Sequence, residues 1–253
     1  MFIKSYNKYG ALNSHDVLKI IAMVAMFIGH IGAFIYNDMV ELRLIGRFGF
    51  PIFLFLVGYS LKYKNQLDLI ILAVAISIFD GFIKYPLLPL NILYTVIFTR
   101  IILNYLDKKG YLEKYLLQIM LLLIIWWLPT KLLTDYGTGA MMFAICGYLV
   151  RNGKKDSKSN IFFVLSILFY TSTQPLLYTF NAVNLSIFVL LTAFMGAFFY
   201  KYSFKKHTSS NKVISLTLFI SRNSMLFYFL QLIIFKLVNS NLYPENYEYF
   251  KLF

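Results

Sequence analysis

Long runs of apolar residues, separated by short polar segments, dominate this chain. A helix needs about 20 mainly apolar residues to cross the hydrocarbon layer of a bilayer. Runs near that length predict about nine transmembrane helices, with a range of eight to ten. The runs are 17–36, 48–63, 67–83, 87–106, 116–128, 132–150, 161–173, 183–200 and 213–238. The pattern therefore predicts an all-α, polytopic membrane helical bundle.

The segments between the runs favour a single integral membrane domain over residues 1–253. The longest polar stretch, 202–212, has only the length of a loop. The last run is long enough to tilt or to break near residues 221–224. Residues 1–15 then form a short segment before the first span, and residues 239–253 form a tail. No small-residue cleavage site follows the first run, so we expect that run to be retained rather than removed as a signal peptide.

Lys and Arg residues are unevenly distributed between alternate connections. Fifteen of them fall on one side of the predicted spans and five on the other. Connections with an excess of Lys and Arg stay in the cytoplasm. The bias therefore predicts a cytoplasmic N-terminus, an extracytoplasmic tail, and a multi-pass location in a bacterial cytoplasmic (inner) membrane. An odd number of spans gives the same orientation.

The composition excludes several other classes of protein. Charged residues make up 14% of the chain, against roughly 25% in an ordinary soluble domain. The net charge is +13, but because the cations cluster between apolar runs we expect a lipid bilayer and no nucleic acid as the partner. The single cysteine, Cys146, excludes an internal disulfide and a cysteine zinc site, and we expect no metal.

A few polar side chains lie within or beside the apolar runs, where burying a charge is costly, so each is a functional candidate. They are His30 in the first run, Asp80 in the third, Asn91 at the start of the fourth, Asp135 and Tyr136 at the start of the sixth, and Arg47 before the second. With the N-terminus inside, all of them fall in the outer third of the bilayer. The sequence therefore predicts one polar site at that depth.

Each candidate also has a plainer interpretation. A lone histidine in a membrane often serves as a hydrogen-bond partner between helices. Asp80 and Asp135 can each pair with a cation at the interface, and the candidate cations are Arg47, Lys84 and Lys131. Arg100, in the fourth run, can snorkel inward or pair with a carboxylate.

Two helices carry polar residues at spacings that put them on one face. Asp16 and His30 lie nearly on one face of the first helix, roughly 21 Å apart, which predicts a polar path from the cytoplasmic side. In the last run, Ser224, Tyr228 and Gln231 fall at i, i+4 and i+7 and share a face. That face is either a wall of the site or a helix–helix contact.

Several segments, taken in order, resemble the TraX family of membrane proteins. They are residues 18–23, 26–33, 42–55 (LRLIGRFGFPIFLF) and 90–95 (LNILYT), Asp135-Tyr136-Gly137 with Gly139, and residues 224–232. Together they cover most of the chain, and the segment 42–55 is the most specific. The chain departs from the family pattern at Gly29, where an Asp-His pair is usual, and at Gln231, where a histidine is usual.

The resemblance implies a membrane-bound acyltransferase. The family is grouped with the transmembrane acyltransferases, and its founding type acetylates the N-terminus of conjugative pilin. A donor of acetyl-CoA or another acyl-CoA at the cytoplasmic face is implied. The resemblance also implies an amine or hydroxyl acceptor near the outer face, in a pilin-like peptide, a glycan or a lipid.

The candidate residues then take hypothetical roles in acyl transfer. His30 is the expected general base or transient acyl carrier, because an imidazole titrates near neutral pH. Asp80 or Asp135 is expected to orient it. The substrate-binding candidates are Arg47, Asn91, Tyr136 and Gln231, the first three as oxyanion donors. A transporter or flippase is one alternative, and a non-catalytic assembly protein of a conjugation or envelope complex is another.

Overall fold

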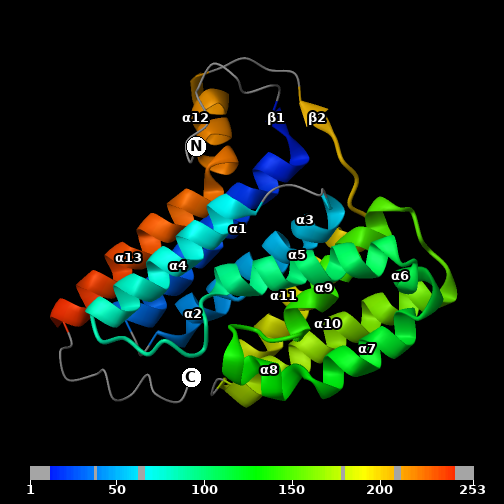
Figure 1. Ribbon diagram of the computed structural model, residues 1–253, viewed down its shortest axis with the longest axis horizontal. Coiled ribbons are helices and arrows are strands. Elements are labelled where there is room, and N and C mark those ends of the chain that lie inside the picture. The colour runs from blue at the N-terminus through cyan, green and yellow to red at the C-terminus, as the bar shows by residue number, and fades with distance from the viewer. Residues whose placement is uncertain (1–11, 37–38, 62–65, 178–179, 208–211, 243–253) are drawn as a thin grey trace. The chain divides into compact units, whose positions relative to one another are not determined.

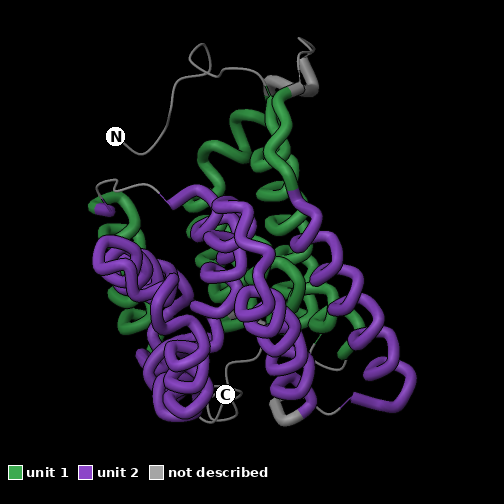
Figure 2. Tube along the Cα trace, turned by 90° about the vertical axis from the view of Figure 1, so that its right-hand side faces the viewer, with its two compact units in different colours: residues 1–53, 67–85, 203–252 green, residues 54–66, 86–202, 253 purple. Residues whose placement is uncertain are grey.

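Helices make up nearly all of the regular structure in the computed structural model, which describes residues 12–36, 39–61, 66–177, 180–207 and 212–242 (Figure 1). Of these residues 80% are helical, which confirms the all-α prediction. The described strands are two residues each, and they pair antiparallel, β1 (Leu12–Asn13) with β2 (Lys206–His207). The chain forms two compact units, coloured separately in Figure 2. The predicted terminal segments 1–15 and 239–253 lie largely outside the described residues.

Unit 1 comprises Met1–Phe53, Leu67–Tyr85 and Ser203–Leu252. Its helices are α1 (Ser14–Phe34), α2 (Val40–Gly46), the first residues of α3 (Gly49–Tyr59), α4 (Leu67–Phe82), α12 (Lys212–Arg222) and α13 (Ser224–Leu242). Helix α1 packs against α2, α12 and α13, and α13 packs against α4. The N-terminus of α1 is fixed by a capping box, in which Asn13 and Asp16 bond to each other's backbone N–H groups. Helix α1 is therefore the central element of this unit.

A close contact between glycines brings α1 and α2 together. A Cβ atom added to Gly29 would lie 2.6 Å from the Gly46 Cα, and one added to Gly32 would lie 2.7 Å from the Leu42 Cβ. Small residues at such positions let two helix backbones approach closely. The Gly29 departure from the family pattern therefore has a structural reason, because a side chain at this position would strike the backbone of α2.

Unit 2 comprises Leu54–Gln66 and Pro86–Tyr202. Its helices are the remainder of α3, α5 (Ile92–Lys108), α6 (Tyr111–Lys114), α7 (Leu116–Ile125), α8 (Trp127–Leu133), α9 (Gly139–Arg151), α10 (Ser157–Leu177) and α11 (Ala182–Tyr200). Helix α9 is buried along residues Ala140 to Leu149, and α5, α7, α10 and α11 pack around it. Gly58 of α3 and Gly147 of α9 would each bring a Cβ atom onto backbone of the other helix. Helix α9 is thus the core of this unit.

The described helices offer fewer membrane crossings than the nine that we predicted. By length and composition α1 and α11 are able to cross, and two bent pairs raise the number to four if each pair is one span. The bent pairs are α7 with α8, at 58°, and residues 216–222 with 224–240, at 79°. The second bend confirms the predicted break near residues 221–224.

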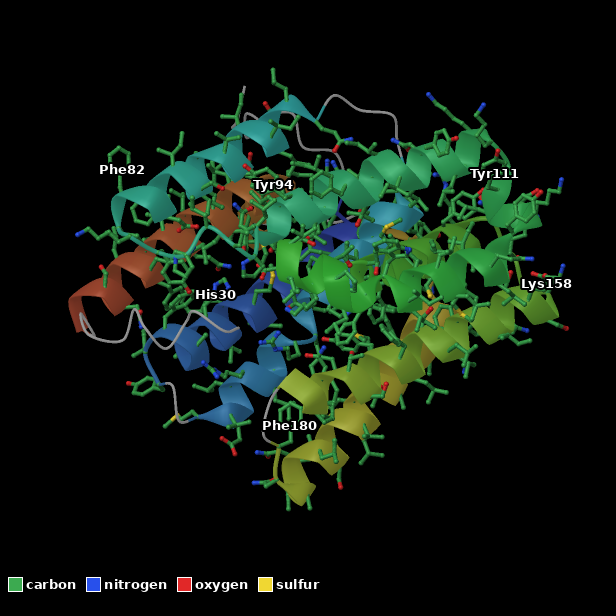
Figure 3. All side chains as sticks on the ribbon, turned by 60° about the horizontal axis from the view of Figure 1, so that its bottom comes forward. His30, Phe82, Tyr94, Tyr111, Lys158 and Phe180 are labelled. Carbon is green, nitrogen blue, oxygen red and sulfur yellow. The ribbon has the colours of Figure 1, made fainter. Side chains whose placement is uncertain are left out.

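The shortfall has two physical causes. Five apolar runs form helices shorter than about 20 residues, because α3, α4, α5, α7 and α9 contain 11, 16, 17, 10 and 13 residues. Helix α10 is long enough, with 21 residues, but hydroxyl and amide side chains dilute its apolar character. Apolar side chains nevertheless lie on the outside of many helices. Phe82, for example, is 82% exposed and projects from α4 in Figure 3.

Candidate functional site

Three aromatic rings contact His30 of α1, within unit 1, and Figure 3 labels this residue. The ring centroids of Phe34, Tyr228 and Phe235 lie 5.7, 6.0 and 5.8 Å from the centroid of the imidazole. The Phe34 and Phe235 rings present an edge to it, a favourable geometry for aromatic pairs. The aromatic contacts come from both α1 and α13, so the packing of these two helices fixes the position of the imidazole.

Two polar atoms beside these rings have no partner. The Nδ1 atom of His30 and the Nε2 atom of Gln231 are both buried and make no hydrogen bond to any described residue. Gln231 lies three residues after Tyr228 and four before Phe235, so it shares the face of α13 that carries both rings. Buried polar groups are normally hydrogen-bonded, so two unsatisfied groups on facing helices mark a place where a substrate or water would be bound. The predicted face of Tyr228 and Gln231 thus lies toward His30.

Asp80 forms a buried ion pair that the sequence analysis did not foresee. Its carboxylate accepts a hydrogen bond from the Lys236 Nζ atom of α13 at 2.5 Å, and both side chains are buried. The Tyr85 ring packs on the same ammonium group, with its centroid 4.3 Å from Nζ. The carboxylate therefore pairs with Lys236 and not with one of the cations suggested from the sequence, and the role of Asp80 in orienting His30 stays a prediction.

A second ion pair joins the start of α1 to the end of α12. Asp16, at the start of α1, accepts hydrogen bonds from the Ser221 hydroxyl at 2.7 Å and from the Arg222 guanidinium at 2.8 and 3.0 Å. These partners satisfy the carboxylate, so in this structure Asp16 serves to attach α12 to α1. The predicted polar path from Asp16 to His30 begins at a residue with a structural role.

The sequence analysis missed Lys236 and Arg222, the partners of these two acids. Both cations lie inside the last apolar run, where a charge is as costly as it is at Asp80. Counting cations only in the connections overlooked them. Cations within the spans were the available signal, because a buried acid needs a buried partner.

Arg47 lies in the same unit, at the C-terminal end of α2. Its backbone N–H bonds back to the Arg43 carbonyl, and its half-buried side chain carries one of two charges that act on the His30 imidazole, the other being that of Lys236. Arg43 has a structural contact, because its Nε donates to the Gly32 carbonyl of α1 at 3.3 Å. Unit 1 thus contains His30, Arg47, Asp80 and Gln231 from the predicted set.

The other three predicted residues, Asn91, Asp135 and Tyr136, belong to unit 2. Two segments meet there, since the Leu90 N–H donates to Leu133 and the Asp135 N–H donates to Leu90. The Thr95 hydroxyl donates to the Asp135 carbonyl at 2.7 Å. The structure therefore brings together two segments that carry the family resemblance, 90–95 and 135–137.

Asn91 and Tyr136 have identifiable local roles in this arrangement. The Asn91 side chain accepts a hydrogen bond from the Leu93 N–H at 3.2 Å and caps the N-terminus of α5. Tyr136 adopts a left-handed conformation, with φ of 68°, and its ring centroid lies 5.6 Å from the Lys131 Nζ atom. No group of three or more His, Cys, Asp or Glu residues suited to a metal ion occurs in the described part of the chain.

Comparison with known proteins gives the family. The family model described as TraX protein matches residues 14–239, and the chain belongs to the TraX family. A relative from Rickettsia prowazekii (strain Madrid E), named Uncharacterized protein RP591, is 28% identical over 233 residues, which cover 89% of this chain and 92% of the relative. No solved structure matches this chain significantly.

Proposed function

We propose that this protein is an integral membrane acyltransferase that moves an acetyl or longer acyl group from acyl-CoA to an amine or hydroxyl acceptor. The acceptor classes are a pilin-type protein, a glycan and a lipid. Membership of the TraX family supports the proposal. The observation that carries it is His30, whose buried Nδ1 atom has no hydrogen-bond partner among the described residues. The Nε2 atom of Gln231, on the face of α13 that carries Tyr228 and Phe235, has none either.

The proposed chemistry is general base catalysis by the imidazole. His30 takes the proton of the acceptor N–H or O–H group as the nucleophile bonds to the thioester carbonyl carbon. The carbon–sulfur bond then breaks, and the thiolate of coenzyme A leaves and takes a proton from the imidazolium. Arg47 and Lys236 supply positive charge near His30, which favours a negatively charged tetrahedral intermediate. The aromatic contacts hold the ring in position, and Asp80 or Asp135 stays the predicted group that orients it. Asn91, Asp135 and Tyr136 remain predicted contributors.

The proposed location is a bacterial cytoplasmic membrane, crossed several times, with the N-terminus in the cytoplasm. The uneven distribution of Lys and Arg supports this orientation. The exposed apolar side chains along many helices support a lipid environment, because soluble proteins rarely expose such continuous apolar surface. Nine spans would require several of the shorter apolar helices to cross as well.

The central test replaces His30 by Ala and by Gln and follows radiolabelled acetyl-CoA in membranes that contain the full chain. We expect label transfer to protein, glycan or lipid to fall by about a hundredfold or more, because general base catalysis contributes about that much. His15→Gln is the matched control: it removes another histidine of α1, one that packs on Phe204, and transfer should be unchanged.

The outcomes separate the function classes. Unchanged transfer in His30→Ala would remove this residue from the mechanism. Accumulation of a substrate in vesicles without covalent modification would instead indicate a transporter. A silent His30→Ala in a strain whose envelope assembly depends on the chain would indicate an assembly protein.

A further inference from the structure

A second group of unsatisfied polar side chains lies on α5 in unit 2, apart from His30. Arg100 makes no hydrogen bond or ion pair with any residue that the structure describes. The Thr99 hydroxyl oxygen and the Asn104 Oδ1 atom are buried and have no partner either. Three such groups within about one and a half turns of one helix are unusual, because buried polar groups are nearly always paired.

The helix geometry aligns part of this group. Arg100 and Asn104 are one turn apart and share a face of α5. Thr99 precedes Arg100, about 100° around the helix, and is buried, 1% exposed. Asp107 follows on the face of Arg100, two turns away. Its carboxylate accepts a hydrogen bond from the Tyr148 hydroxyl of α9 at 2.6 Å, so it is already engaged.

The missing partner of Arg100 is an anion. A guanidinium removed from water without a counter-charge costs several kcal/mol, so an unpaired one is stable only where an anion or water reaches it. Arg100 is half-buried, which leaves it accessible to a small charged group. Its planar fork of N–H donors matches two oxygens of a phosphate, and a Thr hydroxyl adds a donor. The side-chain amide of Asn104 presents its N–H donors at the place of Oδ1 when it turns by half a rotation.

The position along α5 indicates which phosphates can reach it. Arg100 lies eight residues, roughly 12 Å, before the end of α5 at Lys108. Figure 3 labels Tyr94, in the first turn of α5, and Tyr111, just beyond its end. The end at Lys108 and Lys109 belongs to a connection that the charge bias assigns to the cytoplasm. Phosphates available there are those of a soluble acyl-CoA and those of lipid headgroups.

We propose that Arg100, with Asn104 and Thr99, forms a phosphate-binding site on α5. If the phosphate belongs to acyl-CoA, the site deepens the proposed function and rests on it, because it would hold the donor from the cytoplasmic side. If the phosphate belongs to a lipid, the site anchors α5 at the inner leaflet and stands without that function.

The test uses the purified full chain in neutral detergent, with coenzyme A as the first probe and vesicles of phosphatidylglycerol or phosphatidylcholine as the second. Arg100→Gln should weaken the binding of one of these probes by at least about tenfold, because a charge-assisted contact to phosphate is lost. Arg100→Lys keeps the charge without the fork and should give a smaller loss. Lys109→Gln, an exposed cation at the end of the same helix, is the matched control and should leave binding unchanged.

The arms of the experiment distinguish the sources. Loss of coenzyme A binding in Arg100→Gln, with normal binding in Lys109→Gln, supports a donor site, and loss of phosphatidylglycerol binding alone supports a lipid site. Equal binding of both probes by Arg100→Gln and the unchanged chain would overturn the proposal, as would failure of the unchanged chain to bind either probe. If Arg100→Gln does not fold, the binding of the two probes by Arg100→Lys and Asn104→Leu is compared with that of the unchanged chain in the same way.

A separate variant, His30→Ala, tests the proposed acyltransferase function. His30→Ala should bind coenzyme A normally while losing transfer. If it transfers normally and Arg100→Gln still loses phosphate binding, the acyltransferase mechanism fails and the phosphate site stands.

Discussion

At the scale of single residues, the structure shows how a polar group is tolerated in an apolar helix. Asp80 is paired with Lys236 and Asp16 with Arg222, whereas His30 keeps an unsatisfied nitrogen. The two carboxylates are therefore satisfied by ion pairing, whereas the imidazole keeps a nitrogen that is available for chemistry. Sequence spacing treated all three alike, because it shows where a charge lies along a helix but not what faces it.

The Asp80–Lys236 pair should be strongly coupled. Lys236→Met leaves a buried carboxylate unpaired, and we expect it to lower the free energy of unfolding by about 3–5 kcal/mol. The double variant Asp80→Asn with Lys236→Met should recover most of that loss, as measured by denaturant unfolding of the purified chain. The exposed pair of Lys154 and Glu113 is the control, and Lys154→Met should cost about 0–1 kcal/mol. Equal losses in the single and double variants would contradict the coupling.

Gly29 should not tolerate a side chain. Gly29→Ala places a methyl group against the Gly46 backbone, and we expect a loss of about 1–3 kcal/mol in the free energy of unfolding from overpacking. Gly81→Ala, in α4, meets nothing within 4 Å and should be neutral or more stable by up to about 1 kcal/mol. Thermal unfolding of the two variants side by side measures the difference. A Gly29→Ala protein as stable as Gly81→Ala would show that α1 and α2 do not pack this closely.

At the scale of elements, the sequence predicted where some helices begin and end. Asn91 was predicted to open the fourth run, and it caps α5. The break predicted near residues 221–224 falls between α12 and α13. Both features are local, because a cap or a break depends on residues within one turn. The contact of Thr95 with Asp135 is not local, because it joins residues 40 positions apart, and the sequence analysis did not predict it.

Asn91 allows its capping role to be separated from a role in catalysis. Asn91→Ala should cost about 1 kcal/mol of stability, because the cap is lost. Asn91→Asp keeps an oxygen acceptor for the Leu93 N–H and should keep the stability, but it removes the amide donor. If Asn91 stabilises an oxyanion, Asn91→Asp should lose acyl transfer while its thermal unfolding is unchanged. Normal transfer in Asn91→Asp would leave the residue as a cap alone.

At the scale of the whole molecule, the number of crossings is set by helix length rather than by apolar runs. Several runs of the expected composition fold into helices of 10 to 13 residues, too short to cross alone. Hydropathy along the chain does not show where a helix ends, because the residues beyond the end are often apolar too. The all-α class and the membrane environment were nonetheless readable from composition.

Helix α5, with 17 residues, provides the sharpest test of orientation. In a Cys146→Ala background, single cysteines at Leu87, Lys109 and Asn152 are treated with a membrane-impermeant maleimide in intact cells. We expect Leu87→Cys to react at once, and Lys109→Cys and Asn152→Cys to react only after permeabilisation, because the charge bias puts those connections inside. Reaction of Leu87→Cys and Lys109→Cys from the same side would show that α5 does not cross the membrane.

The sequence by itself determined the helical class, the family, the start of a helix at Asn91 and the break near residues 221–224, because these depend on composition and on neighbours along the chain. Only the tertiary structure decided which cation meets which acid. Lys236 lies 156 positions after Asp80, and Arg222 lies 206 after Asp16. Helical periodicity shows which side chains share a face, but the packing of distant helices decides what that face meets. For the same reason the unsatisfied Nδ1 of His30 became visible only once its neighbours were in place.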